Sequence, residues 1–262
     1  MRNCLMALIL AAAGLAIPAA LRAQGTTETN ATTATRPDIS GVWRQHAPPE
    51  ARSYALYTFT KESAPMTPWA LEKFKQAKPS FGPRSSPDSN DPVNPTTGNS
   101  VGCFPPGVPR IYLQPFPMEI IQIPGRVLIL YEFDHFFRQI WTDGRGHDTA
   151  LPETYMGDSI GHWEGDTLVV DTVNFNDKTW LDRGGVPHSN KLHVVEHFHR
   201  VNADTLQIDI TMEDPIALTR PWSGTQYFQL RPKWNIMEMV CEDNANFMGI
   251  AKELAKPAAT KP

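Results

Sequence analysis

The sequence contains little cysteine, no glycine-rich phosphate-binding motif and, after its first 23 residues, no long apolar segment. Neither the G-x-G-x-x-G nor the G-x-x-x-x-G-K-[S/T] pattern occurs, and strand-like segments do not alternate with helical ones. Both features are typical of nucleotide-binding α/β folds, in which the glycines let the backbone approach the phosphates. Their absence argues against a nucleotide-binding protein.

An excess of basic residues is also missing. The chain carries 24 Lys and Arg against 28 Asp and Glu, which gives a formal net charge of −4 at pH 7. A protein that binds nucleic acid needs a positively charged surface that replaces the counterions of the phosphates. The composition therefore argues against a nucleic-acid partner, and we expect a small molecule as the ligand or substrate.

The first 23 residues have the pattern of a secretory signal peptide. Arg2 supplies a positive start, residues 5–20 are mostly apolar, and Ala23 is a small residue of the kind found at cleavage sites. The apolar run is too short and too poorly flanked for a membrane-spanning helix, and we expect no membrane span later in the chain. The sequence therefore predicts a periplasmic or secreted protein.

The rest of the chain is predicted to hold one domain between two less structured ends. Residues 24–36 are rich in threonine and lack apolar periodicity, which predicts a disordered leader. Residues 37–245 carry the patterned sequence of a single β domain, and residues 246–262 form a C-terminal tail. Cys103 and Cys241 are the only cysteines after residue 23, so in an oxidising compartment we expect them to form one disulfide.

From residue 119 onward, short segments of alternating apolar and polar residues are separated by turn residues. This pattern predicts antiparallel strands at residues 119–123, 127–133, 136–142, 160–163, 167–173, 192–200, 205–212, 225–231 and 236–240, the last two as a hairpin. Gly41-Val42-Trp43 is similar to the opening of lipocalin-type barrels, in which the Trp plugs one end. Together they predict an all-β fold: an antiparallel, lipocalin-like barrel or a strongly curved sheet.

One short helix is expected before these strands. Thr67 can cap its N-terminus, Pro68 suits its first position, and it should end near Pro79. Residues 80–109 are rich in Pro, Gly, Ser and Asn, and we expect no regular strand there. The fold is therefore predicted to combine nine or so strands with one helix and one disulfide.

Residues 192–200 carry three histidines at alternating positions of one predicted strand. A period of two places His193, His197 and His199 on one face and Glu196 on the other. A His-x-His pair on a strand can bind one metal ion, so a zinc-dependent enzyme is an alternative. An exposed polar face, or pairing with carboxylates, explains these histidines better, because no second ligand cluster has diagnostic spacing. We therefore expect no cofactor and keep zinc as the weaker alternative.

Two further histidines lie directly beside acids in the sequence. His147 precedes Asp148, and His135 follows Asp134. A carboxylate that orients an imidazole is the minimum arrangement for a general base near neutral pH. His147, Asp148 and His135 are therefore candidate catalytic residues, although a turn-capping role explains His135 equally well.

The segment at residues 179–189 combines a tryptophan, an acid and a histidine, which packing alone does not explain. Loops at the mouths of barrels often carry binding groups. His188 is the leading catalytic candidate, Asp182 is a candidate to orient it, and Trp180 is expected to stack on a substrate. The structural alternative for His188 is a hydrogen bond that orders the loop.

Two hairpin tips supply further candidates for substrate contact. Trp163 and Glu164 precede a turn, and Glu164 with Asp166 would form a carboxylate pair for acid–base chemistry, although a solvated turn is the simpler explanation. Arg145 is placed to bind polar groups of a substrate. The structural interpretation of Arg145 is a bidentate contact with Asp143 that locks their turn.

Several motifs resemble a family of exported, mostly uncharacterised bacterial proteins. The resemblance spans residues 37–245 and is carried by residues 102–110, residues 141–145, the SIGHWEGDTLVVDT segment at 159–172 and the TWLDRGGVPHS segment at 179–189. It implies export but carries no established activity. Its pattern leads us to expect arginine where this chain has His162, His197 and His199. The shared polar candidates are then His135, His147, His188 and Glu196, which we keep as candidate catalytic residues.

These residues favour a cofactor-free enzyme that uses His, Asp and Glu as acid and base on a small organic substrate, such as a carbohydrate or an aromatic compound. Lyase, isomerase and hydrolase chemistry all suit such groups. The alternative is a lipocalin-like protein that binds a small ligand without chemistry, with Trp43 and the aromatic strands near Phe133 and Phe136 as its walls. Catalysis requires a titratable pair within hydrogen-bonding distance in a cavity, whereas binding requires only walls and donors.

Overall fold

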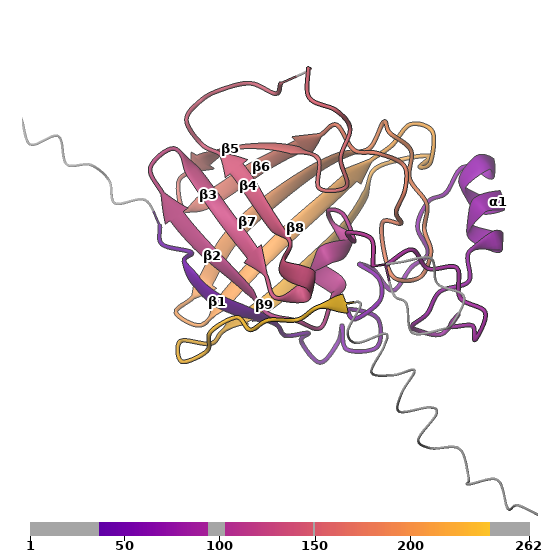
Figure 1. Cartoon of the computed structure of the whole chain (residues 1–262), viewed down its shortest axis with the longest axis horizontal. Helices are drawn as coiled ribbons and strands as arrows, with labels where there is room; N and C mark the ends of the chain where they lie inside the picture. Colours follow the sequence, from indigo (N-terminus) through magenta and orange to yellow (C-terminus); the bar gives the residue numbers. More distant parts are fainter. Residues whose placement is uncertain (1–36, 94–102, 149, 242–262) are drawn as a thin grey trace, which may run out of the picture. The chain divides into compact units, whose positions relative to one another are not determined.

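A computed structural model of the chain describes residues 37–93, 103–148 and 150–241. Nine strands close into a barrel in which they follow one another in sequence order (Figure 1). The predicted all-β barrel with one helix and one disulfide is confirmed, and the barrel is closed. The predicted signal peptide at 1–23, the leader at 24–36 and the tail at 246–262 lie outside the described residues.

The strands correspond closely to the segments predicted from alternation. They are β1 (Gly41–Gln45), β2 (Met118–Ile123), β3 (Arg126–Tyr131), β4 (Phe137–Trp141), β5 (Asp158–Glu164), β6 (Thr167–Val173), β7 (His193–Asn202), β8 (Thr205–Glu213) and β9 (Trp222–Leu230). The helices are α1 (Pro68–Gln76) and two short 3₁₀ turns, η1 (Arg110–Leu113) and η2 (Phe133–His135).

The predicted strand at residues 236–240 is wrong. These residues run irregularly after β9, which pairs with β8 on one side and with β1 on the other. The apolar positions at 236–240 suggested a hairpin partner, but β1 takes that place in the sheet because the barrel closes there. The chain after β9 instead leads to the disulfide at Cys241.

The expectation of an entirely antiparallel sheet also needs one correction, because β4 and β5 run parallel. Residues 142–157 lead from the end of β4 back to the barrel end at which β4 began. Gly157 ends this crossing with φ +71°, and a Cβ there would lie 2.6 Å from Cγ2 of Thr172. Glycine is therefore required where the crossing segment rejoins the sheet. The other eight pairings are antiparallel.

The two ends of the barrel differ in their connections. Two-residue turns at 124–125, 165–166 and 203–204 close one end, which we call the turn end. Long segments, including residues 46–117 and 174–192, gather at the other, which we call the loop end. Helix α1 belongs to these segments and lies beside the loop end in Figure 1. Most of the long connecting segments are therefore concentrated at one end of the barrel.

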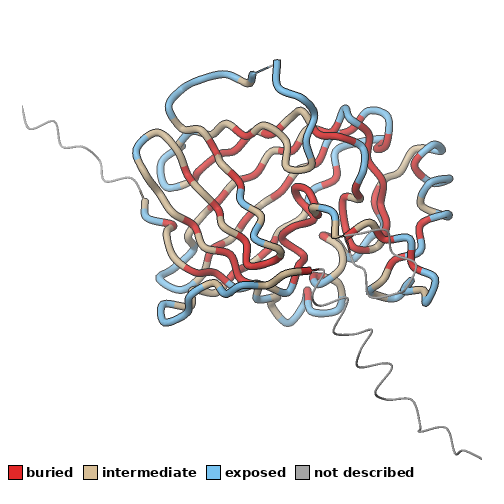
Figure 2. Tube along the Cα trace, in the orientation of Figure 1, coloured by how far each residue is buried: buried red, intermediate tan, exposed pale blue. Residues whose placement is uncertain are grey.

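The barrel interior is a packed core built by strand alternation. Along β7, Val194, Glu196 and Phe198 are buried, whereas His193 and His197 are only partly buried, and Figure 2 shows such alternation along the strands. This confirms the predicted separation of the strand into two faces. Trp43 is completely buried, which makes it a core residue of the barrel.

The predicted helix and its cap are confirmed. The hydroxyl of Thr67 accepts a hydrogen bond from the amide of Ala70 at 3.2 Å, and Pro68 occupies the first helical position. The helix ends at Gln76, three residues before Pro79. Within the described part of the chain, no helix combines the length and the apolar character needed to cross a membrane.

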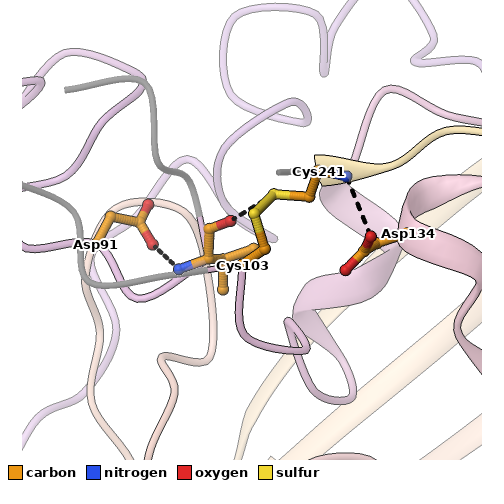
Figure 3. Close-up of a disulfide and its surroundings, with 5 residues drawn as sticks. Asp91, Cys103, Asp134 and Cys241 are labelled. Atoms are coloured by element: carbon orange, nitrogen blue, oxygen red, sulfur yellow. Dashed lines mark hydrogen bonds between the residues drawn. A yellow bond between two sulfur atoms is a disulfide. The ribbon is translucent and has the colours of Figure 1, made fainter. Parts of the chain in front are cut away.

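The predicted disulfide joins Cys103 to Cys241 across 138 residues of sequence, with 5.8 Å between the two Cα atoms. Figure 3 shows that the amide of Cys241 also faces the side chain of Asp134, whose Oδ1 accepts its hydrogen at 3.1 Å. The segment after β9 is thereby fastened to the turn between β3 and β4 and to the long segment that precedes η1.

Candidate functional site

The residues predicted to form a site do not converge on one place. Glu196 lies inside the barrel, His147 and the β7 histidines lie on its outer surface, and Trp163, Glu164 and Arg145 lie at the turn end. His188, Trp180 and Asp182 share the segment 174–192 at the loop end. The described residues therefore offer several separate clusters, and two pockets lie at the last of them.

Inside the barrel, Glu196 forms a fully buried ion pair with Arg138 of β4. The guanidinium donates from Nη1 to Oε1 at 2.9 Å and from Nη2 to Oε2, so the contact is bidentate. Burial by itself lowers the pKa of Arg138, but the charge of Glu196 outweighs it and raises that pKa above its ordinary value. Arg138 therefore stays charged, and the role of the buried pair is structural.

Polar partners from three further elements complete this inner network. Arg138 Nη1 donates to the hydroxyl of Tyr112 at 2.7 Å, Nη2 to Thr172 Oγ1 at 2.8 Å, and Nε to Ser159 Oγ at 3.0 Å. Ser159 is the central residue of a G-x-S-x-G match at 157–161, a spacing typical of nucleophile elbows. Here the serine lies on a strand, is buried, and binds a guanidinium, so it is not placed as a nucleophile.

A second charge network lies on the outer surface of β5, β6 and β7. His147, from the crossing segment, contacts Asp158 through Nδ1 at 2.9 Å and Asp171 through Nε2 at 2.8 Å. Asp171 also contacts His193 Nε2 at 2.8 Å. Asp148, the predicted partner of His147, instead accepts the amide of Ala150, so its assignment as the orienting acid is wrong.

Two of the three β7 histidines, His193 and His199, are paired with different acids. His193 contacts Asp171 and, at 3.4 Å, Glu213, while His199 lies 3.4 Å from Asp166. Partial burial lowers the pKa of His193, but the hydrogen bonds and charges of Asp171 and Glu213 raise it above its ordinary value overall. Within the described residues, no group of three or more His, Cys, Asp or Glu is arranged to hold a metal ion.

The candidates at the turn end form local contacts. Glu164 accepts from His162 at 2.8 Å on the exposed rim, and Trp163 of β5 packs partly against the core. Arg145 stacks at 3.5 Å on Trp141 and forms the predicted bidentate contact with Asp143. Neither described pocket includes these side chains.

His135 also lacks the partner that its sequence neighbour suggested. It lies in η2 with φ +55°, next to Asp134 with φ +52°, in the left-handed region. The carboxylate of Asp134 is occupied by the amide of Cys241. Asp134 and His135 therefore belong to the turn between β3 and β4, against which the segment ending at Cys241 is held. The turn-capping interpretation applies to Asp134, whose carboxylate accepts the Cys241 amide.

The segment 174–192 folds back on itself at the loop end. Leu181 donates its amide to the carbonyl of Val186 at 2.7 Å, and Trp180 pairs with Pro187 in an isolated bridge. Gly185 makes this turn against α1 with φ +98°, and a Cβ there would lie 2.7 Å from that of Ala77. The glycine therefore allows the segment to lie directly against the end of the helix.

His188 and Thr179 meet at the base of this fold. The hydroxyl of Thr179 lies 2.9 Å from His188 Nε2, and His188 Nδ1 lies 3.0 Å from the carbonyl of Ser189. A carbonyl can only accept, so Nδ1 carries the proton and Nε2 offers its lone pair to the hydroxyl. Ser189 is held in turn by Asp214, through its amide at 2.6 Å and its hydroxyl at 2.9 Å.

The surroundings of His188 keep its ring neutral. The side chain is 4 % exposed, and this burial lowers the pKa of His188, while the Ser189 carbonyl and the charges of Asp214 and Asp177 partly offset the effect. A neutral imidazole with a free lone pair beside a hydroxyl is the geometry of a base next to its proton donor. Asp182, the predicted orienting acid, instead accepts the backbone amides of Gly184 and Val186 and does not contact His188.

A pocket of about 310 Å³ opens onto this pair. His188, Thr179 and Trp180 line it together with charged and amide side chains, which include Lys73, Gln76, Asn90, Asp177 and Lys178. Arg110 lies over the ring of Trp180 at 5.3 Å and forms a buried ion pair with Asp91 at 2.7 Å. The indole is thereby fixed at the pocket wall, and the polar lining suits a polar ligand.

Sequence reasoning missed several members of these clusters. Arg138 was detectable, because Glu196 shares its face with the apolar Phe198, and an inward acid requires an inward cation on another strand. Thr179 carried no comparable signal, since its pairing with His188 depends on how residues 174–192 fold back. Asp158 and Asp171, the partners of His147, are brought to it by the crossing segment.

Comparison with known proteins does not assign a function to this site. No protein-family model matches the chain, and no curated protein matches it either. The resemblance to exported bacterial proteins therefore stays a prediction.

Proposed function

We propose that the protein is a cofactor-free enzyme that performs acid–base chemistry on a small polar organic substrate in the His188 pocket. One observation carries this proposal: a buried, neutral imidazole points its lone pair at a hydroxyl group 2.9 Å away, beside a pocket of about 310 Å³. That arrangement meets the requirement of a titratable pair within hydrogen-bonding distance in a cavity.

His188 is the general base in this proposal. Its Nε2 accepts the proton from Thr179 Oγ1 while Nδ1–H keeps its bond to the Ser189 carbonyl. The imidazolium that forms is stabilised by that carbonyl and by the nearby charges of Asp214 and Asp177. Trp180 forms a wall against which the substrate packs.

Among lyase, isomerase and hydrolase chemistry, the contact with Thr179 favours a hydrolase. The base already touches a protein hydroxyl, which becomes a nucleophile when its proton moves to Nε2. Attack of Oγ1 on an electrophilic carbon would give a covalent intermediate, and the imidazolium would return the proton to the leaving group. In a lyase or isomerase, a substrate group would have to replace Thr179 beside the ring.

Export belongs to the proposal as well. The N-terminal 23 residues have the signal-peptide pattern, and the disulfide between Cys103 and Cys241 is of the kind that persists in oxidising compartments. We therefore place the activity in the periplasm or outside the cell.

The test is hydrolysis of a panel of small chromogenic esters and glycosides by the purified protein and its variants. We expect His188→Gln to lower kcat/KM by about 10²–10⁴-fold, the usual contribution of a positioned base. Thr179→Val should lower kcat/KM by a similar factor, whereas Thr179→Ser, which keeps a hydroxyl, should retain activity. Because burial lowers the pKa of His188, the rate should be constant at neutral pH and fall only in acid.

A matched control is His162→Gln, since His162 is an exposed histidine paired with Glu164 at the turn end. It should leave turnover unchanged. Turnover that survives in His188→Gln would refute the assigned role of the base.

A second candidate function is binding without chemistry, and one observation favours it. Both ring nitrogens of His188 already have partners inside the protein, as in a histidine that merely orders a loop. Ligand binding that is unaffected by Thr179→Val, with no turnover in any variant, would support this candidate. The ligand would then contact the walls of the His188 pocket, because Trp43 and Phe133 are core residues of the barrel.

A further inference from the structure

A second pocket, of about 230 Å³, has no role in the proposed reaction. It is lined by Asp182, Gly184 and Val186 of the same loop-end segment and by eight residues of the long segment between β1 and β2, namely Tyr57, Thr58, Thr60, Lys61, Glu62, Ser63, Ala64 and Met66. Phe74 of α1, with Phe81, Pro83 and Arg84 after it, completes the wall. The two pockets share no lining residue.

The polar centre of this pocket is the carboxylate of Asp182, which is only 2 % exposed. Its Oδ1 accepts both the amide of Gly184 at 2.9 Å and that of Val186 at 3.1 Å. Burial raises the pKa of Asp182, although the amide of Val186 and the hydroxyl of Thr58 partly offset this. Oδ1 holds the backbone turn, and the Thr58 hydroxyl is a further donor to this carboxylate. Because each carboxylate oxygen has two lone pairs, Oδ2 still has the capacity to accept a hydrogen from a ligand.

Positive charge is already supplied to this carboxylate by the protein. Arg84 lines the same pocket and interacts with this carboxylate electrostatically, and Arg110 does so as well, although its charge is also paired with Asp91. Arg84 is fixed in place, because it donates to the carbonyls of Gly184 and Phe74, each at 2.8 Å, and stacks on the ring of Phe74 at 3.7 Å. A cationic ligand is therefore not required for charge balance, and an uncharged hydrogen-bond donor fits the site better.

The rest of the wall is mainly apolar. Ala64, Met66, Phe74 and Val186 line it, and Phe81 is held by Arg183, whose guanidinium lies 3.9 Å from the ring. An apolar cavity of ~150 Å³ accommodates benzene. A pocket of about 230 Å³ therefore has room for one substituted ring rather than for a chain of rings.

We propose that this pocket is a binding site for a small, uncharged hydroxylated aromatic compound, a monocyclic phenol. The phenol donates its hydroxyl to Oδ2 of Asp182, and its ring packs among Met66, Phe74 and Phe81. An O–H···carboxylate bond in a desolvated site is short and strong, so one such bond gives both orientation and selectivity. This proposed phenol site does not depend on the proposed catalytic site at His188, and each can be tested without the other.

The test uses a matched pair of ligands, 4-methylphenol and 4-methylanisole, which differ only in whether the oxygen carries a hydrogen or a methyl group. Titration calorimetry with the whole protein should show saturable binding of the phenol and affinity for the ether that is lower by about tenfold or more, the ratio for one hydrogen bond to a charged group. Equal affinity for both ligands, or no saturable binding of the phenol, overturns the proposal.

Asp182→Asn is the sharpest variant, because the asparagine Oδ1 can still accept the amides of Gly184 and Val186. It should fold, as judged by circular dichroism and melting, and lose most of its selectivity for the phenol over the ether. Asp204→Asn makes the same chemical change in the turn between β7 and β8 and should bind the phenol as the unaltered protein does.

Phe81→Ala provides a second variant in case Asp182→Asn fails to fold, since Phe81 is partly exposed and its removal should be tolerated. It should weaken phenol binding severalfold by removing one wall of the ring site. His188→Gln should leave phenol binding intact, which separates this site from the proposed catalytic one. Unchanged phenol affinity in Phe81→Ala, or its loss in His188→Gln, would place the ligand elsewhere and refute the assignment.

Discussion

Strands β6 and β7 carry two charge networks on opposite faces, and the two differ in almost every physical respect. On the inner face, Thr172 and Glu196 surround the guanidinium of Arg138 in a fully buried cluster. On the outer face, Asp171 and His193 belong to a chain of histidines and carboxylates in contact with water. Neighbouring residues of one strand thus belong to a buried ion pair and to a partly exposed one, because the side-chain period of two places them on opposite faces.

The largest effect is expected from breaking the inner pair. Glu196→Gln removes the negative charge and leaves Arg138 as a buried, uncompensated cation. Removing one partner of a buried ion pair typically costs about 3–5 kcal/mol, so the free energy of unfolding in urea should fall by that amount. A loss below about 1 kcal/mol would show that water reaches the guanidinium.

The double variant Arg138→Met with Glu196→Leu is the matched control for that experiment. Replacement of both charges by apolar side chains removes the desolvation cost as well as the attraction, so most of the stability should return. If it does not, the hydrogen bonds of Arg138 to Tyr112, Ser159 and Thr172 matter more than the ion pair itself.

A smaller effect is expected from Asp171→Asn, which weakens the outer network at its shared carboxylate. Asp171 contacts both His147 and His193, but its side chain is 41 % exposed, and solvent screens both contacts. The free energy of unfolding should fall by at most about 1 kcal/mol. A loss as large as that of Glu196→Gln would contradict the distinction between the two faces.

The pH dependence of the free energy of unfolding should distinguish the two networks further. The pKa of His193 is raised in the folded state, so its contribution is full below its unfolded pKa and is lost as the pH rises through the folded value. The pKa of Asp171 is lowered, since its contacts with His193 and His147 outweigh burial, and its contribution is lost in acid. Stability measured by urea unfolding should therefore decline as the pH rises above about 6.5, the ordinary pKa of histidine, and less so in His193→Gln.

The smallest expected difference is in the response to salt. Raising the ionic strength to 1 M shortens the Debye length from about 8–10 Å to about 3 Å, which weakens interactions between exposed charges but affects buried pairs far less. The stability difference between Asp171→Asn and the unaltered protein should shrink at 1 M NaCl, by a few tenths of a kcal/mol. The difference produced by Glu196→Gln should stay the same, and parallel changes in both would argue against a dry inner cluster.

The inner network was partly predictable from the sequence and the outer one was not. Alternation along residues 192–200 placed Glu196 opposite the histidines, and the structure confirms this. Sequence adjacency suggested Asp148 for His147, but adjacent side chains in an irregular segment need not face each other, and the real partners come from β5 and β6. Strand periodicity fixes which face a residue occupies, whereas the partner depends on the path of the crossing segment.

The same limit applies to the loop end. The tryptophan, acid and histidine of residues 179–189 predicted functional side chains there, and His188 and Trp180 do share a pocket. Asp182 lies in a different pocket, because the turn at Gly185 separates positions that are close in sequence. The strands, the helix cap and the disulfide followed from local chemistry, while the division into two pockets required the tertiary fold.

The parallel contact between β4 and β5 has a consequence for how the barrel moves. It is a ladder of only two residue pairs, Ile140 with Ser159 and Trp141 with Ile160, whereas the other pairings are longer. Side chains bridge this seam on the inside, where Arg138 reaches Ser159. On the outside, His147 fastens the crossing segment to Asp158. The amides along this seam should therefore exchange their hydrogens with solvent before those of the other strands. The barrel should open locally between β4 and β5 first, because side-chain contacts rather than a long strand ladder hold these two strands together.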